Sequence, residues 1–222
     1  MKLLAVADIH SSRRGLNTVL ELAKEHGPDL IAIAGDVTTF GPVEFARELA
    51  DALPARTIFV PGNCDIPPVA DVFNTGERMN LHLKKQVVDG IHFVGLGGWM
   101  ASPALTEDWG IPPADAIEKI EPLFDDKTVL LTHVPPYGHL DAVPTPFGAI
   151  KKGREHIGST ELNILIERAR PALVVSGHVH ENRGVEEAAG TLFVNPGPAK
   201  NGFGAIIEFY RMQWKARLLK IE

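Results

Sequence analysis

Five short apolar runs in this chain each end within a residue or two of side chains that commonly bind metal ions. The runs span residues 3–7, 30–34, 57–60, 128–132 and 173–176. The polar residues that follow them are Asp8, His10, Asp36, Asn63, His133, His178 and His180. In open α/β sheets, ligands bind beyond the carboxyl ends of the strands. If the five runs are neighbouring strands, these side chains meet, and together they suit two divalent cations.

The pattern between the runs predicts alternating strands and helices. The runs at 3–7 and 30–34 are continuously apolar, which is typical of strands buried on both faces. Helical spacing follows each of them, and residues 79–94 predict three short strands with a turn at Asp89-Gly90. Further helices are expected over 114–124 and from a Ser159 or Thr160 cap to 169. Residues 97–113 and 134–158 are expected to form loops, and strands are expected over 185–189, 192–194, 204–210 and 214–221.

The composition is that of an ordinary globular domain of 222 residues. We expect one domain over 1–222, with two packed sheets and helices outside them. A net charge of −6 and a single cysteine argue against a duplex nucleic-acid partner and a disulfide framework. No apolar run reaches the roughly 18 residues of a membrane span, and the first ten residues lack a signal-peptide core. We therefore expect a cytoplasmic protein without a membrane partner.

No single motif decides the function. Asp8 and His10 are two residues apart, so on extended chain they share one face, but a solvated loop would also accommodate them. Asp36 after Gly35 is ordinary turn chemistry, and His133 could be a buried histidine that donates to a carbonyl. Taken together the motifs favour function, because all of them stand at the carboxyl end of a run that independently predicts a strand.

The motifs of this chain resemble the signature of the calcineurin-like metallophosphoesterase superfamily, in its small single-domain bacterial and archaeal branch. In chain order they are D-x-H, G-D, G-N-x-[DE], a lone His and G-H-x-H. The resemblance implies an α/β/β/α sandwich of two mixed sheets. It implies that Asp8, His10 and His180 bind one metal ion, that Asn63, His133 and His178 bind another, and that Asp36 bridges both. It also implies hydrolysis of a phosphodiester or phosphomonoester by metal-bound hydroxide, with Mn favoured over Fe or Zn.

The segment around Asn63 departs from the usual family pattern at one position. The residue after this asparagine is commonly His, and here it is Cys64. A thiol is a weaker hydrogen-bond donor than imidazole. The rate of hydrolysis should therefore fall most for esters with poor leaving groups. We take Asn63, Cys64 and Asp65 as catalytic candidates, with Asp65 orienting a neighbour. The alternative for Cys64 is a small residue that fills space.

Three other residues are candidates for binding substrate. Arg13 stands at a helix start, where a cation opposes the helix dipole. His139 and His156 lie in the long segment after His133, although loop histidines are more often solvated. Trp99 and Trp109 could stack on a nucleobase or cover the core.

Three function classes fit the motifs. An enzyme acting on a small phosphorylated or nucleotide substrate is favoured because all seven ligands are present. The resemblance also allows a scaffold of the kind found in a retromer subunit, whose ligands are lost, or a Mn-dependent nuclease with added capping domains. The acidic chain offers little room for a stable nucleic-acid surface. The sequence leaves homo-oligomerisation open.

Overall fold

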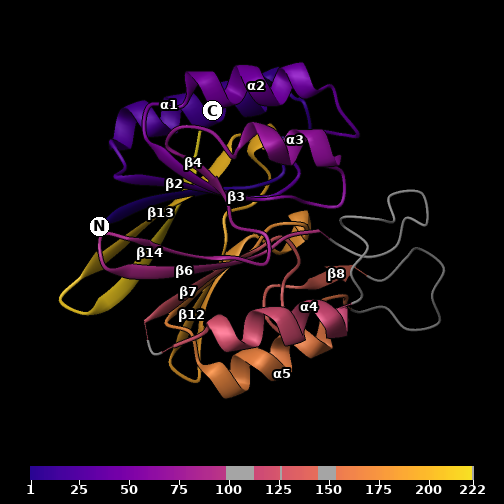
Figure 1. Cartoon of the computed structure of the whole chain (residues 1–222), viewed down its shortest axis with the longest axis vertical. Coiled ribbons are helices and arrows are strands. Elements are labelled where there is room, and N and C mark those ends of the chain that lie inside the picture. The colour runs from indigo at the N-terminus through magenta and orange to yellow at the C-terminus, as the bar shows by residue number, and fades with distance from the viewer. Residues whose placement is uncertain (99–112, 126, 145–153, 222) are drawn as a thin grey trace.

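Two six-stranded sheets pack face to face between two layers of helices (Figure 1). The computed structural model describes residues 1–98, 113–125, 127–144 and 154–221. Helices α1 (Arg13–His26), α2 (Val43–Ala52) and α3 (Pro67–Val72) cover the first sheet. Helices α4 (Pro113–Ile120) and α5 (Thr160–Ala169) cover the second. The expected α/β/β/α sandwich is confirmed.

The first sheet has the order β14-β13-β1-β2-β3-β4. Its strands are β1 (Lys2–Val6), β2 (Leu30–Ala34), β3 (Arg56–Val60), β4 (Arg78–Asn80), β13 (Phe203–Tyr210) and β14 (Gln213–Lys220). Strands β1 to β4 are parallel, whereas β13 pairs antiparallel with both β1 and β14. The sheet is therefore mixed.

The second sheet has the order β11-β12-β10-β7-β6-β5. Its strands are β5 (Lys85–Val88), β6 (Ile91–Leu96), β7 (Thr128–Thr132), β10 (Leu173–Val175), β11 (Gly184–Ala188) and β12 (Thr191–Asn195). The four central strands are parallel, and β5 and β11 run antiparallel at the two edges.

The five ligand-bearing strands do not form one row of neighbours. Strands β1, β2 and β3 are adjacent in the first sheet, whereas β7 and β10 are adjacent in the second. Their carboxyl ends therefore meet across the interface between two sheets. Sequence periodicity could not assign the strands to separate sheets, because strands buried on both faces show the same continuous apolar pattern in either sheet.

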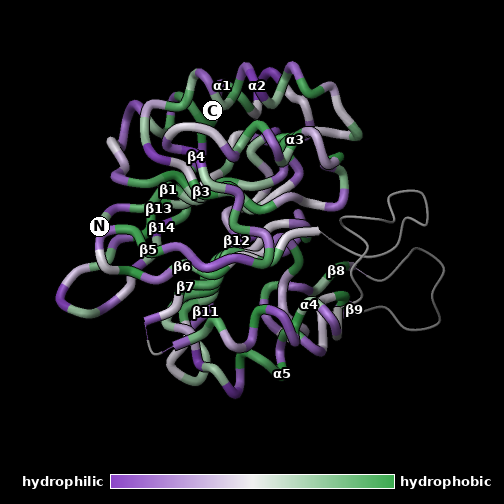
Figure 2. Tube along the Cα trace, viewed as in Figure 1, coloured by the Kyte–Doolittle hydropathy of each residue, from purple (hydrophilic) through white to green (hydrophobic). Residues whose placement is uncertain are grey.

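Alternate residues of the central strands bury opposite faces. On β1, Leu3 and Ala5 lie in the core between the sheets, while Leu4 and Val6 lie in the core under α1 and α2. Figure 2 shows the resulting band of hydrophobic strands between more polar outer segments. Burial on both faces explains the continuous apolar runs and fixes the rigid strand ends on which the polar residues sit.

Ser12 and Ser159 cap the amino ends of α1 and α5, and Ser159 is one of the two residues expected to cap its helix. The Ser12 side chain accepts a hydrogen bond from Gly15 N at 3.2 Å, and Ser159 accepts one from Leu162 N at 3.1 Å. Such caps satisfy amide groups that have no partner inside the helix.

Several short elements escaped the sequence analysis. The six-residue helix α3 is too short for its apolar period to be recognised. Residues 134–158 were expected to be loop, but β8 (Ala142–Pro144) and β9 (Arg154–His156) pair there as a small antiparallel sheet. The helix expected over 114–124 stops at Ile120, before a 3₁₀ turn that contains Pro122. Trp99 and Trp109 lie outside the described residues.

None of the helices in the described ranges combines the length and the apolarity needed to cross a membrane.

We predict that Phe73→Ala lowers the free energy of unfolding by about 3–5 kcal/mol. Phe73 is fully buried after α3, and its ring stacks on that of Phe59 with centroids 4.3 Å apart. Urea denaturation would measure the loss. Tyr210→Ala, at a ring that is 68% exposed, is the matched control and should change stability little. Equal stabilities of the two variants would contradict this packing.

Candidate metal centre

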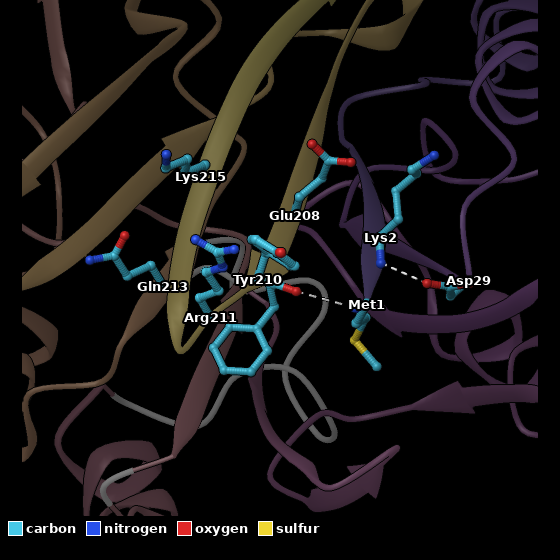
Figure 3. Close-up of a pocket in the computed structure, with 9 residues that line it drawn as sticks. Met1, Lys2, Asp29, Glu208, Tyr210, Arg211, Gln213 and Lys215 are labelled. Atoms are coloured by element: carbon cyan, nitrogen blue, oxygen red, sulfur yellow. Dashed lines mark hydrogen bonds between the residues drawn. The ribbon is translucent and has the colours of Figure 1, made fainter.

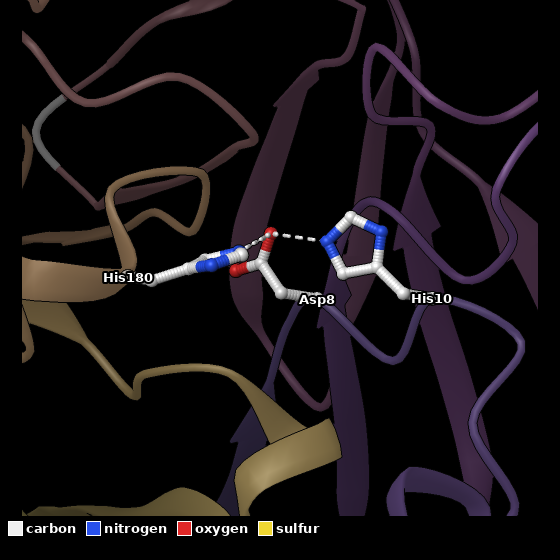
Figure 4. Close-up of side chains that lie close together, drawn as sticks. All are labelled: Asp8, His10 and His180. Atoms are coloured by element: carbon white, nitrogen blue, oxygen red, sulfur yellow. Dashed lines mark ion pairs between the residues drawn. The ribbon is translucent and has the colours of Figure 1, made fainter.

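The first group of ligands gathers around the Asp8 carboxylate. Asp8 and His10 follow β1, and His180 begins the 3₁₀ turn η2 (His180–Asn182) after β10. Asp8 Oδ1 lies 3.2 Å from His180 Nε2 and 3.8 Å from His10 Nε2. Figure 4 shows the two imidazoles approaching the same carboxylate from different segments of the chain. The arrangement offers one oxygen and two nitrogens to a single cation.

The second group gathers around the Asn63 amide oxygen. Asn63 follows β3, His133 follows β7, and His178 follows β10. Asn63 Oδ1 lies 3.0 Å from His133 Nε2 and 3.1 Å from His178 Nδ1. This group therefore joins ligands from both sheets.

Asp36, after β2, stands between the two groups. Its Oδ1 is 3.6 Å from His133 Nε2, and its Oδ2 is 3.6 Å from His10 Nε2. The two oxygens of one buried carboxylate thus face different ligand groups. This is the geometry expected of a carboxylate that bridges two ions.

Buried polar atoms without a hydrogen bond indicate that the candidate ligands are suited to bind metal ions. Asp8 Oδ1 and His10 Nε2 are buried and make no hydrogen bond within the described part of the chain. His133 Nδ1 donates to the carbonyl oxygen of Ala34 at 2.8 Å, which directs Nε2 toward the Asn63 oxygen. Buried polar atoms without partners are costly, and a cation would satisfy them.

Burial and the neighbouring charges set the protonation of the histidines. Burial lowers the pKa of His178 to about 4, and the positive charge of His133 acts in the same direction. Burial alone would also lower the pKa of His133, but the carboxylates of Asp36 and Asp8 outweigh it and raise that pKa. At neutral pH, His178 is thus uncharged and ready to bind a cation. His133 holds its proton to a higher pH than a free histidine does, and a proton on Nε2 must leave before that nitrogen can bind a metal.

Four of the ligand residues have left-handed backbone conformations. The φ angles are 57° at Asp8, 52° at His10, 53° at Asp36 and 66° at His178. Such conformations cost free energy in residues other than glycine and concentrate at functional sites. Backbone hydrogen bonds from Asp8 N to Gly35 O and from His10 N to Asp36 O hold these loops together. The strand ends are therefore locked in conformations that aim their side chains at one point.

Glycines at two positions permit the close approach of the ligand loops. A Cβ at Gly62 would lie 2.1 Å from Asp36 Oδ1, and a Cβ at Gly35 would lie 2.5 Å from His133 Nδ1. Neither distance is compatible with a side chain. The glycines before Asp36 and Asn63 are thus packing requirements of the centre.

Cys64 and Asp65, two of the predicted catalytic residues, contact the ligand loops in different ways. Cys64 N donates to Asp36 Oδ1 at 2.8 Å, and Asn63 Nδ2 donates to the Cys64 sulfur at 3.3 Å. Burial and the nearby Asp36 carboxylate raise the pKa of Cys64 to about 12, so its side chain is a thiol. The catalytic role of Cys64 stays a prediction.

Asp65 is fully buried and holds two ligand loops together. Its carboxylate accepts hydrogen bonds from the amides of Gly62, Val37 and Thr38 at 3.0, 3.2 and 2.8 Å. Burial and the charge of Asp36 raise the pKa of Asp65 to about 6, against the effect of these amides. Its contacts therefore position the segments that carry Asp36 and Asn63.

The predicted substrate-binding residues contact partners other than the ligands. Arg13 pairs with Glu48 of α2. His139 Nδ1 lies 2.8 Å from Glu186 Oε1, and its ring stacks on Phe193. His156 Nδ1 lies 2.6 Å from a buried oxygen of Asp141, described further below. A substrate-binding role for each of the three stays a prediction.

Supporting residues that the sequence analysis missed lie behind the ligands. Thr39 Oγ1 is 3.2 Å from His10 Nδ1, on the ring edge away from the centre. The Asn195 side chain donates to the carbonyl of Val179 at 2.9 Å and accepts from Gly197 N. It thereby supports the residue between His178 and His180. The turn residues after Asn195 are the only sequence feature that could have indicated its supporting role.

A separate hollow lies at the amino end of β1, the end opposite Asp8 (Figure 3). Lys2, Asp29, Glu208, Arg211 and Lys215 are among the residues that line it. The Asp29 carboxylate accepts from the backbone of Lys2 at 2.7 Å, and Lys2 Nζ donates to the His26 carbonyl. These contacts tie the chain terminus to the end of α1, so the centre around Asp36 remains the stronger candidate for chemistry.

Comparison with known proteins agrees with this geometry. A family model described as Calcineurin-like phosphoesterase matches residues 1–182. The uncharacterized protein MJ1162 of Methanocaldococcus jannaschii is 28% identical over 210 residues, which cover 89% of this chain and 88% of that protein. The UPF0046 protein K07C11.7 of Caenorhabditis elegans is 26% identical, with 91% of this chain and 71% of that protein covered.

Solved structures share the fold at low sequence identity. TT1561 of Thermus thermophilus superposes with a TM-score of 0.74 at 22% identity, with 97% of each chain covered. A structure described as a novel archaeal phosphodiesterase gives a TM-score of 0.54 at 15% identity, covering 99% of this chain and 100% of that one. These likenesses concern the fold.

We predict that Gly62→Ala empties the metal centre. The added methyl would overlap the Asp36 carboxylate and backbone, so the bridging oxygens must move. Metal content by elemental analysis should fall well below that of the unmodified protein. Gly90→Ala, in a turn where a Cβ meets nothing within 4 Å, is the control and should keep its metal. Full metal occupancy in the Gly62 variant would refute the close approach.

We also predict that metal binding releases a proton from His133. Because its pKa is raised in the folded protein, the extra proton is bound at low pH and is lost as the pH rises through that pKa. Metal affinity should therefore increase over the same range. Calorimetric titrations in buffers of different ionisation enthalpy, at about pH 6 and about pH 9, would count the protons. Equal proton release at both values would contradict the assignment.

Proposed function

Because the chain belongs to the calcineurin-like phosphoesterase family, we propose that it hydrolyses phosphodiester or phosphomonoester bonds with two divalent metal ions. One observation carries this proposal. The two oxygens of Asp36 face two different groups of ligand atoms, one around Asp8 and one around Asn63. Two ions held by these groups would activate a water molecule and polarise the phosphoryl oxygens of the ester.

The side chains of the centre supply the ligand atoms that would hold the two ions. Asp8, Asp36 and Asn63 provide oxygen ligands, and four histidines provide nitrogen ligands. Oxygen and imidazole donors suit Mn, Fe or Zn, and we favour Mn. The hydrogen bond from His133 Nδ1 to Ala34 O fixes that ring and directs its Nε2 toward the centre. The chain therefore presents the ligands in fixed orientations before substrate arrives.

The local charge favours an anionic substrate although the protein is acidic. Two divalent cations carry four positive charges, and the carboxylates of Asp8 and Asp36 neutralise two of them. The remaining positive charge attracts phosphate against the overall charge of −6. We therefore propose a small phosphorylated compound or nucleotide as substrate. The complete ligand set argues against a scaffold that has lost its metals.

We predict that the metal-loaded protein hydrolyses aryl phosphate esters and that Asp36→Asn lowers the rate by at least about 100-fold. The amide cannot bridge two cations as a carboxylate does. A panel of aryl monoesters, aryl diesters, cyclic nucleotides and dinucleotides, assayed with Mn, Fe and Zn in turn, would measure the activity. Glu44→Gln, on the exposed surface of α2, is the control. An inert wild-type protein with both metal sites filled would sink the proposal.

A further inference from the structure

The small sheet formed by β8 and β9 lies next to segments that carry two of the candidate ligands. Tyr137 N donates to Ser159 O at 2.9 Å, and Ser159 N donates to Pro135 O at 3.0 Å. This ladder starts two residues after the ligand His133. On the other side, β8 packs against η2, whose first residue is the ligand His180. The sheet therefore lies alongside the segments that leave the metal centre.

A buried carboxylate organises this segment. Asp141 is fully buried, and its Oδ2 accepts hydrogen bonds from Gly138 N and Gly158 N at 3.1 and 3.0 Å. Its Oδ1 lies 2.6 Å from His156 Nδ1. The glycine amides satisfy one oxygen, and the second oxygen is directed at an imidazole. Asp141 thus fixes the ring of His156 through Nδ1 and leaves Nε2 on the opposite edge.

His156 differs from the other histidine of the same segment. The His139 ring is stacked on Phe193 with centroids 4.1 Å apart, and it pairs with Glu186. The His156 side chain is 44% exposed, and the half-exposed ring of Tyr137 stands 5.3 Å away. The buried carboxylate of Asp141 thus positions the partly exposed imidazole of His156. This is how proteins orient an imidazole for contact with a ligand.

We propose that His156 contacts the substrate: its Nε2–H donates a hydrogen bond to a phosphoryl oxygen of the bound ester, and Asp141 positions the ring. The inference rests on the proposed function, because it requires a phosphate ester at the metal centre. The ligand class is a phosphate monoanion or dianion, whose oxygens accept strong hydrogen bonds from charged or polarised donors. Asp141 acts only through His156.

Two amide substitutions separate this role from a purely structural one. In His156→Gln, the amide nitrogen occupies the place of Nε2 and can still donate to phosphate. In His156→Asn, the amide nitrogen occupies the place of Nδ1 and can still donate to Asp141. We expect His156→Asn to raise the dissociation constant of inorganic phosphate about tenfold or more, and His156→Gln to raise it much less. Asp141→Asn should weaken phosphate binding and add little to His156→Asn.

Calorimetry with inorganic phosphate and metal-loaded protein measures these constants without turnover. His92, on β6, also pairs through Nδ1 with a carboxylate, that of Asp125, so His92→Asn and His92→Gln are matched controls that should bind phosphate normally. Unchanged binding in both His156 variants, or loss in His156→Gln alone, would overturn the inference. Failure of the metal-loaded wild type to bind phosphate or hydrolyse any ester would instead refute the proposed function.

Discussion

Electron-rich atoms from two different sheets face one another at the centre of this protein, and the surrounding structure is arranged to hold them there. His133 Nε2 and His178 Nδ1 lie 3.0 and 3.1 Å from Asn63 Oδ1, and Asp8 Oδ1 is buried without a hydrogen bond from the described residues. Carboxylate and imidazole lone pairs do not attract each other at such distances. Their proximity is favourable only with a proton or a cation between them.

Rigid supports in the folded chain hold these atoms close together. The strands that carry the ligands are buried on both faces, so their ends cannot shift without disturbing two cores. Left-handed backbone at Asp8 and Asp36 is held by hydrogen bonds between neighbouring loops. Asp65 ties the loop of Asp36 to the loop of Asn63 through backbone amides. A centre built in this way needs little reorganisation when cations bind.

Beyond the ligands, the segment after β7 carries a buried polar pair of its own. Its buried Asp141 fixes an imidazole in the same manner that Ala34 and Thr39 fix the ligand rings. The thiol of Cys64, in the loop after β3, keeps its proton and is a weak donor. Around the candidate ligands, the neighbouring loops thus carry a fixed imidazole and a protonated thiol.

The sequence by itself determined the five ligand-bearing strands, the order of the ligand residues and their placement at strand ends. Continuous apolar runs reveal buried strands, and a polar residue just after each run must lie at a carboxyl end. The tertiary structure alone decided that β7 and β10 belong to a second sheet and that Asp36 faces both ligand groups. It alone revealed that Asp65 binds backbone amides and that β8 and β9 replace a loop. Pairing between distant strands depends on packing and register, which local periodicity does not record.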